Sequence, residues 1–313
     1  MNEIDTYLYS GFLDAGKTSF IQDNLFHDYF YRHGSTLILC FEEGEQAYEE
    51  AALSERRGSV SFYEGNETVR DFCLREIARV KPDRVIIEDN VMIPDLSESL
   101  PDVLRIRAKT SLISGVTLAP FFRNLKPQFT QVLKDANLVL FNRVSDKESL
   151  AAYSTPFRLI NPRASYLWQS PMGYHEKAFG IPLTYDKNDS VLTIREEDYA
   201  CFYLDSLESP EDYSGKTVEL TLQIQDEPVP DDTFVFGGRK VFTCCFADIQ
   251  NLGFFIRKEE SFQPERYSWV HISAKAYTAS VFHQKRLCLS VQNAEQTAPP
   301  KQELIGLESR GNT

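Results

Sequence analysis

The 313-residue sequence lacks three features that would each place it in a particular class of protein. It has no apolar run near the roughly 20 residues that a membrane-spanning helix needs, and it begins with neither the basic nor the apolar stretch of a signal peptide. Basic side chains are scarce, 33 against 46 acidic ones, and the formal net charge of −13 opposes binding to polyanions. We therefore expect a cytoplasmic protein that has no nucleic-acid partner.

Cysteine is also scarce, and no two cysteines have the C-x-x-C spacing of a redox or zinc motif. Six scattered cysteines in a cytoplasmic chain of this length predict reduced thiols rather than a disulfide framework. The overall composition, 42% hydrophobic and 25% charged, is typical of globular proteins, and the length suffices for two domains.

The first part of the chain alternates short apolar runs with stretches of helical periodicity. This alternation predicts an α/β domain over residues 1–180, in which helices cover a mostly parallel sheet. The expected strands are 6–10, 36–41, 60–63, 84–87, 111–116, 138–141 and 164–168. The expected helices are 17–32, 68–80 and 121–136.

After about residue 190 the pattern changes to strand-length runs separated by turns rich in Pro, Gly and Asp. We expect a small all-β domain over residues 190–293, of the OB-like barrel type, although a compact sandwich would have similar spacing. Its strands are expected at 217–224, 233–236, 241–246, 253–256, 269–276 and 286–291, with a turn at the sequence GGRK. The tail, residues 294–313, has few apolar residues and is expected to be flexible.

Negative charge is concentrated in residues 186–232, which hold 14 acidic side chains against three basic ones. Such a density predicts a solvated acidic face. Alternatively, this face could dock a basic partner or bind a cation weakly.

The strongest motif is the segment Gly11 to Thr18, GFLDAGKT, which satisfies the phosphate-loop pattern G-x-x-x-x-G-K-[ST] in full. It follows an expected strand and opens an expected helix, so its backbone N–H groups would converge on an anion. Glycine allows the close backbone approach, the Lys17 ammonium would neutralise phosphate charge, and the Thr18 hydroxyl would bind Mg²⁺. The residues predicted to bind nucleotide here are Gly11, Asp14, Ala15, Gly16, Lys17, Thr18 and Ser19. A carboxylate at Asp14 repels phosphate unless it points outward, which argues against fast hydrolysis.

The segment YSGFLDAGKTSFIQDNL resembles the start of the CobW-like GTPases, relatives of the UreG and HypB metallochaperones. PDRVIIEDNV (82–91) resembles their second acidic motif, and INPRA (160–164) a further segment of theirs. The resemblance implies that Glu88 orients Mg²⁺ or its water, so that Lys17 and Glu88 are catalytic and Thr18 and Glu88 hold Mg²⁺. A helix-capping carboxylate is the alternative for Glu88. Val91 stands where the family usually has Gly, which weakens the expected contact with the γ-phosphate.

ANLVLFNRVSD (136–146) resembles the guanine-specificity strand and N-K-x-D motif of the same family. Here Arg143 replaces the lysine, and the acid stands one position further along. The resemblance implies that Asn142 bonds the base, and Asp146 or Ser145 would read the guanine edge. GTP is therefore expected in preference to ATP.

A family metal motif, C-x-C-C, is missing from the interval where CobW-like proteins commonly carry it. The segment Cys40 to Glu45 offers a thiolate and carboxylates that could bind a divalent ion. Alternatively, Cys40 is a buried strand residue beside an acidic turn, and this turn could help to hold Mg²⁺.

The second part of the chain resembles the C-terminal domain of YcgQ-like proteins, predicted soluble partners of a family of membrane permeases. The shared R-x-x-x-T-C-C-x-A-D pattern comprises Arg239, Thr243, Cys244, Cys245, Ala247 and Asp248. Consecutive strand residues point to opposite faces, so the two adjacent cysteines would not hold one ion without a bulge. Packing is one interpretation of the pair, and a site for Zn²⁺ or another transition metal, or a redox role, is the other. His271 and His283 could approach such a site from other strands.

These observations predict a Mg²⁺-dependent P-loop GTPase that is coupled to metal homeostasis or to a membrane permease or metalloprotein client. Two alternatives remain at this point. One is a nucleotide-gated adaptor that does not hydrolyse GTP, and the other is a metal-binding protein that acts through its β domain. A homodimer is possible in each case.

Overall fold

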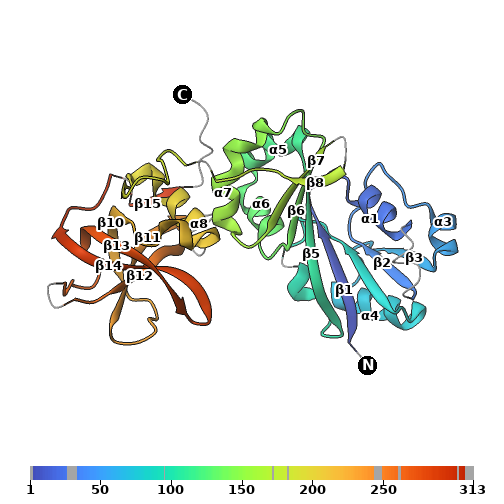
Figure 1. Ribbon diagram of the computed structural model, residues 1–313. Helices are drawn as coiled ribbons and strands as arrows, with labels where there is room; N and C mark the ends of the chain where they lie inside the picture. The colour runs from blue at the N-terminus through green and yellow to red at the C-terminus, as the bar shows by residue number, and fades with distance from the viewer. Residues whose placement is uncertain are drawn as a thin grey trace. The chain divides into compact units, whose positions relative to one another are not determined.

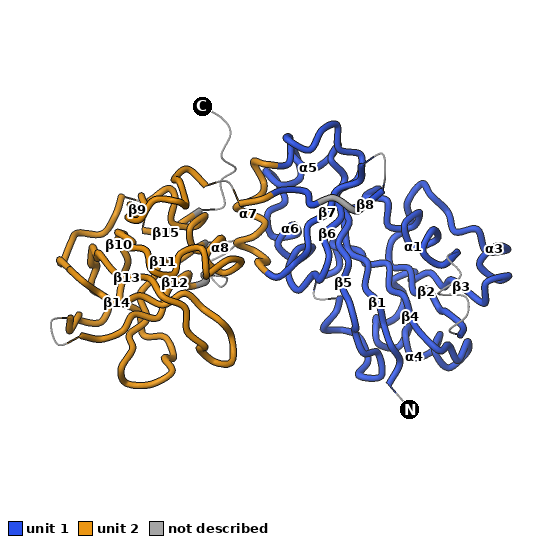
Figure 2. The backbone as a smooth tube through the Cα atoms, viewed as in Figure 1, with its two compact units in different colours: residues 1–150, 163–179 blue, residues 151–162, 180–313 orange. Residues whose placement is uncertain are grey.

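The computed structural model describes residues 3–26, 34–94, 96–170, 173–181, 183–242, 249–259, 262–301 and 303–306. The chain forms two compact units (Figure 2). Unit 1 comprises residues 1–150 and 163–179, and unit 2 comprises residues 151–162 and 180–313. The short segment 151–162 therefore groups with unit 2, although unit 1 segments flank it in the sequence.

Unit 1 is built on an eight-stranded sheet with the order β3-β2-β4-β1-β5-β6-β7-β8 (Figure 1). All neighbouring strands are parallel except β7 and β8, which are antiparallel. The strands are β1 (Ile4–Ser10), β2 (Thr36–Cys40), β3 (Gly58–Phe62), β4 (Arg84–Glu88), β5 (Leu104–Ser114), β6 (Leu138–Asn142), β7 (Ser165–Ser170) and β8 (Gly173–Lys177). The mostly parallel α/β domain predicted from the sequence is confirmed.

Alternate residues of the central strands pack on opposite faces of this sheet. Leu37, Leu39 and Ile87 pack with α4 (Val69–Val80) in one hydrophobic core. Ile38 and Ile86, one position along the same strands, pack with α1 (Lys17–Phe26) and α3 (Glu50–Glu55) in a second core. Because side chains alternate along a strand, Glu88 lies on the α1 side of the sheet.

The helices of unit 1 are short, and the expected helix at 121–136 is two helices in the structure. They are α5 (Gly115–Asn124) and α6 (Lys126–Leu133), and Pro127 stands in the first turn of α6. Proline is accepted there because the first-turn N–H groups have no partner within the helix, whereas it would break a continuous helix. In the parts of the chain that the structure describes, no helix is both long and apolar enough to cross a lipid bilayer.

Unit 2 contains a ring of five strands, as the predicted OB-like barrel requires. The strands pair in the cyclic order β10-β11-β12-β14-β13, closed by a pairing of β11 with β10, and β12 runs parallel to β14. The ring strands are β10 (Thr217–Gln225), β11 (Phe234–Phe242), β12 (Ile249–Arg257), β13 (Trp269–Val281) and β14 (Gln284–Gln296), while β9 (Val191–Thr193) and β15 (Leu304–Gly306) flank them. Two helices, α7 (Ser154–Ile160) and α8 (Tyr199–Glu208), belong to the same unit.

Three expectations for this unit differ from the structure. The GGRK segment lies inside β11 and does not form a turn, because residues 237–240 pair continuously with β12. The tail expected from residue 294 contributes the end of β14, and Leu304–Gly306 pairs as β15 with β11. The acidic segment is only partly solvated: Asp198 is buried and accepts hydrogen bonds from Thr184 and Arg195, and Asp205 accepts one from Tyr213.

Candidate functional site

The phosphate-loop motif connects the end of β1 to the first residue of α1, as the sequence predicts. Its backbone has positive φ at three positions, +154° at Gly11, +59° at Asp14 and +88° at Gly16. A Cβ atom at residue 11 would lie 2.5 Å from the Leu112 carbonyl oxygen, and one at residue 16 would lie 2.9 Å from Nδ2 of Asn142. Packing against backbone therefore requires glycine at residue 11, and the positive φ favours glycine at both positions.

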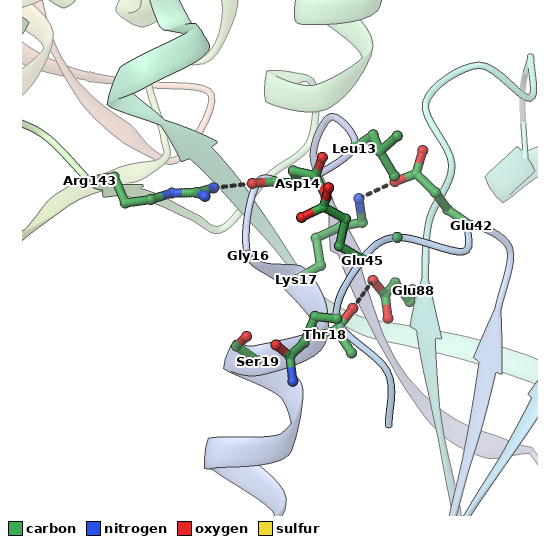
Figure 3. A pocket seen from close by; sticks show the side chains of 12 residues that line it. Leu13, Asp14, Gly16, Lys17, Thr18, Ser19, Glu42, Glu45, Glu88 and Arg143 are labelled. Atoms are coloured by element: carbon green, nitrogen blue, oxygen red, sulfur yellow. Dashed lines mark hydrogen bonds and ion pairs between the residues drawn. The ribbon is translucent and has the colours of Figure 1, made fainter. Parts of the chain in front are cut away.

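The loop borders a pocket of about 510 Å³ at the carboxyl ends of the parallel strands (Figure 3). The lining residues are Leu13, Asp14, Gly16, Lys17, Thr18, Ser19, Glu42, Gly44, Glu45, Gln46, Glu88 and Arg143. This edge of an α/β sheet is where such folds bind ligands, and the N-terminus of α1 favours an anion there. Five of the residues predicted to bind nucleotide thus line one pocket; Gly11 and Ala15 shape the loop behind it.

The Lys17 side chain is buried and makes three interactions. Its Nζ atom donates to the carbonyl oxygens of Gly11 at 2.9 Å and Phe12 at 3.1 Å. It also pairs with a carboxylate oxygen of Glu42 at 2.5 Å (Figure 3). Burial raises the pKa of Glu42, and the nearby Lys17 ammonium acts against that rise.

Thr18 and Glu88 come together at the floor of the pocket. The Thr18 hydroxyl donates to one carboxylate oxygen of Glu88 at 2.8 Å (Figure 3). The Tyr48 hydroxyl donates to the other carboxylate oxygen. Glu88 is 3% exposed, at the end of β4. A hydroxyl and a carboxylate in contact are oxygen ligands of the kind that Mg²⁺ prefers, so these residues fit the metal predicted for them.

Cys40, the last residue of β2, is buried beside this pair, and its Sγ atom lies 3.8 Å from Glu88. Burial is the main cause that raises the pKa of this thiol to about 12. The described residues contain no group of three or more His, Cys, Asp or Glu side chains arranged to hold a metal ion. The 2% exposure of Cys40 at the last position of β2 agrees with a buried strand residue.

The residues predicted to read the base lie after β6. The Asn142 side chain is buried and donates to the Ala15 carbonyl oxygen at 2.7 Å, and its own Oδ1 atom is buried with no partner. Arg143 donates to the Asp14 carbonyl oxygen (Figure 3). Asp146 instead accepts hydrogen bonds from Ser145 and from the backbone N–H of Ser149, so its carboxylate starts the short helix at 148–153.

Asp14 occupies a left-handed backbone position, and its carboxylate approaches the turn at Gly44, where an added Cβ would lie 3.4 Å away. The pocket lining therefore holds four carboxylates, from Asp14, Glu42, Glu45 and Glu88, against the cations of Lys17 and Arg143. A triphosphate entering this pocket needs the counter-charge of a divalent cation.

Sequence reasoning missed the contacts that hold the predicted residues. The sequence predicts Glu42 to be part of an acidic turn or a ligand of a divalent ion such as Mg²⁺, and no motif includes Tyr48. Asp89 was missed too: it is buried, accepts a hydrogen bond from the Ser10 hydroxyl at 2.6 Å, and has a second oxygen with no partner. Burial raises its pKa. The sequence signal that points to it is its place directly after Glu88, the glutamate of the second acidic motif.

Cys244 and Cys245, the predicted thiol site of the second domain, lie outside the described residues. Of the two histidines considered with them, His271 shares a hydrogen bond with Thr221 at 3.0 Å on the neighbouring strand. His283 lies in the turn between β13 and β14, with φ of +63°.

Comparison with known proteins gives one family match and two similar structures. Residues 174–305 match the family model of the DUF1980 C-terminal domain. The crystal structure of the hydrogenase maturation factor HypB from Archaeoglobus fulgidus is similar, with a TM-score of 0.37 and 16% identity over 53% of this chain and 80% of that one. The structure of FlhF complexed with GTP and Mg²⁺ has a TM-score of 0.35 and 13% identity, covering 56% and 69% of the two chains. No curated protein sequence matches the chain.

Proposed function

We propose that this protein binds GTP with Mg²⁺ in the unit 1 pocket and hydrolyses it slowly. The observation that carries the proposal is the meeting of Lys17, Thr18 and Glu88 in one pocket at the N-terminus of α1. These groups come from two separate sequence segments, and each has the chemistry that a phosphate-bound Mg²⁺ requires.

Each side chain has a defined task in this proposal. The Lys17 ammonium neutralises the β- and γ-phosphates, and the N-terminus of α1 receives the phosphate oxygens. Thr18 and Glu88 hold Mg²⁺, which supplies charge neutralisation to the phosphates when bound. Tyr48 keeps the Glu88 carboxylate in position through its hydrogen bond. Catalysis then rests on positioning and electrostatics rather than on a covalent intermediate.

Guanine specificity is the finer part of the proposal. The orphaned Oδ1 atom of Asn142 is a buried acceptor beside the phosphate loop, and buried polar atoms without a partner are uncommon. The segment after β6, which is proposed to bind the base, contacts the phosphate loop through two hydrogen bonds. Asn142 donates to the Ala15 carbonyl oxygen, and Arg143 donates to that of Asp14. Reading of the guanine edge by Asp146 or Ser145 requires the segment after β6 to rearrange, because these side chains bond to each other.

The second candidate is a nucleotide-gated adaptor that binds GTP with little turnover. The four carboxylates of the pocket favour it, since extra negative charge opposes the charge that develops during phosphoryl transfer. Val91 favours it as well, because a buried valine stands where a backbone contact to the γ-phosphate is expected. In either case unit 2 would be the module that meets a membrane permease or a metalloprotein client and links nucleotide state to metal homeostasis.

The test is equilibrium binding of GTP and ATP analogues, with and without Mg²⁺, to the wild type and to Lys17→Ala. We expect Mg²⁺-dependent GTP binding that weakens by about 100-fold in the variant, since a buried charge-assisted contact is lost. Lys216→Ala is the matched control, because Lys216 also donates to backbone carbonyl oxygens but lies in unit 2. Absence of Mg²⁺-dependent binding to the wild type would refute the proposal, and a phosphate-release assay distinguishes the GTPase from the adaptor.

A further inference from the structure

Glu42 and Lys17 form a buried ion pair that the phosphate-loop motif does not predict. Their side chains are 11% and 2% exposed, and the two charged atoms lie 2.5 Å apart. Glu42 lies two residues after β2, in the stretch 41–49 that forms neither helix nor strand. The pair therefore joins the phosphate loop to a segment from a neighbouring strand.

The three hydrogen-bond donors of an ammonium group limit what Lys17 can bind at one time. The carbonyl oxygens of Gly11 and Phe12 and the carboxylate of Glu42 match these three donors. A phosphate oxygen reaches Lys17 only when one of the three leaves. The two carbonyls belong to the loop backbone, whereas the carboxylate is an anion of the same chemical kind as a phosphate oxygen. Glu42 is therefore the group that phosphate replaces.

We propose that Glu42 is an internal competitor of nucleotide, which holds Lys17 until a phosphate group displaces it. This inference rests on the proposed nucleotide binding and adds a determinant of its affinity. Competition of this kind lowers the apparent affinity by the fraction of molecules in which Lys17 is engaged. The protein then binds nucleotide only at concentrations high enough to displace the carboxylate.

The surroundings of Glu42 allow the carboxylate to leave. Residues 43–47, which follow it, are exposed, and Glu42 is held from its own segment through its backbone, whose carbonyl oxygen accepts from the Cys40 thiol at 3.0 Å. A side-chain rotation into solvent therefore breaks the ion pair without breaking that contact. The displaced carboxylate also moves away from Glu88 and Asp89, whose charges oppose its own.

The experiment compares binding of a GTP analogue and of inorganic tripolyphosphate, each with Mg²⁺, by titration calorimetry. Glu42→Gln removes the competing charge, and we expect roughly tenfold tighter binding of both ligands. Glu43→Gln is the matched control, because it removes the same charge from the next residue. The Glu43 side chain is exposed and does not line the pocket. We expect this variant to change the affinity by less than about twofold, as for surface charges. Glu42→Asp keeps the charge but withdraws the carboxylate, and we expect it to tighten binding as well.

The outcomes separate this inference from the proposed function. If the wild type binds both ligands and Glu42→Gln binds them equally or more weakly, Glu42 is not a competitor, and the inference is overturned. If Glu42→Gln and Glu43→Gln tighten binding equally, net charge rather than the ion pair is responsible, which also overturns it. If neither ligand binds to the wild type or to any variant, nucleotide binding itself is wrong, and the competitor role falls with it.

Discussion

Two side chains outside the phosphate-loop motif hold the residues that the motif and its partner strand supply. Glu42 pairs with Lys17, and Tyr48 donates to Glu88. Tyr48 is 8% exposed, and burial, followed by the charge of Glu88, raises the pKa of its hydroxyl, so it remains a donor at any physiological pH. The geometry of the candidate Mg²⁺ site therefore depends on a residue that lies 40 positions from Glu88 in the sequence.

Tyr48→Phe tests this dependence. We expect the free energy of unfolding to fall by about 1–3 kcal/mol, because a buried carboxylate loses a hydrogen bond that involves a charged group. We also expect Mg²⁺-dependent GTP binding to weaken, because the Glu88 carboxylate loses the hydrogen bond that positions it. Urea denaturation and nucleotide titration measure the two effects. Tyr267→Phe removes the same atom from an exposed ring, and equal losses in both variants would contradict a role for the Tyr48 hydroxyl.

The sequence could predict those site residues that lie in one continuous motif or at the end of an apolar strand. Lys17 and Thr18 lie in one continuous motif, and Glu88 ends an apolar strand, so their meeting follows from the order of strands in an α/β sheet. The roles of Glu42 and Tyr48 could not be predicted, because an irregular segment carries them and no periodicity fixes where its side chains point. The structure gives Asp146 a helix-starting role, while its proposed contact with guanine remains a prediction.

At the scale of elements, β5 supports α6, the second helix after it in the chain. The Lys109 ammonium donates to the carbonyl oxygens of Gln131 at 2.6 Å and Lys134 at 2.8 Å, at the C-terminal end of α6. Those carbonyls have no partner within the helix, and a cation there also interacts favourably with the negative end of the helix dipole. The same contact places a charged group in a partly buried position, and this burial lowers the pKa of Lys109 to about 8, against the opposite effect of Asp89.

This lowered pKa predicts the direction in which the free energy of unfolding changes with pH. The folded protein releases the Lys109 proton near pH 8, whereas the unfolded chain keeps it to about pH 10.4. Between these values the unfolded state binds more protons, so the free energy of unfolding rises with pH. Between pH 7.5 and 9.5, we expect the free energy of unfolding of the wild type to rise by about 1 kcal/mol more than that of Lys109→Gln, after allowance for solvent screening.

Urea denaturation at the two pH values measures that gain. Lys126→Gln is the control, because it removes the same charge at the other end of α6. A difference from the wild type that stays constant with pH for Lys109→Gln, or that grows equally for both variants, would contradict the assignment to Lys109.

Elements were predictable where burial makes a strand uniformly apolar. The runs that gave β2, β4 and β6 are almost fully buried, and their expected positions agree with the structure within one residue. The first half of β5 was missed, because Arg105 and Arg107 interrupt its apolar pattern, and they face Glu3 and Asp5 as surface ion pairs. The α8 helix was missed because the sequence on both sides of it has the pattern of strands and turns. Tertiary contacts decide the conformation of this segment.

At the scale of the whole molecule, the contact pattern divides the chain differently from composition. Composition places one boundary near residue 180, whereas contacts group α7, residues 154–160, with unit 2. Within unit 2, α7 packs on α8, and Arg158 pairs with Glu208. A pattern read along the sequence does not show this, because a segment that leaves one unit and returns within 12 residues carries no change of composition.

This division predicts which part of the molecule a core substitution weakens. Phe157 in α7 and Phe141 in β6 are both fully buried, and they lie only 16 positions apart, yet they belong to different units. Truncation of a buried Phe to Ala costs about 3–5 kcal/mol through lost packing and the cavity that remains. We therefore expect scanning calorimetry to show a lowered unfolding transition of unit 2 in Phe157→Ala and of unit 1 in Phe141→Ala.

GTP with Mg²⁺ identifies the two transitions, because a ligand stabilises only the unit that binds it in the folded state, by an amount that grows with its concentration. In the wild type and in Phe157→Ala, we expect the nucleotide to raise the transition of unit 1 and to leave the other unchanged. In Phe141→Ala, the transition that responds to nucleotide should be the one that the substitution lowered. If Phe157→Ala instead lowers the nucleotide-responsive transition, α7 belongs energetically to the nucleotide-binding unit. The two units would then be coupled through that helix, and the assignment of residues 151–162 to unit 2 would be wrong.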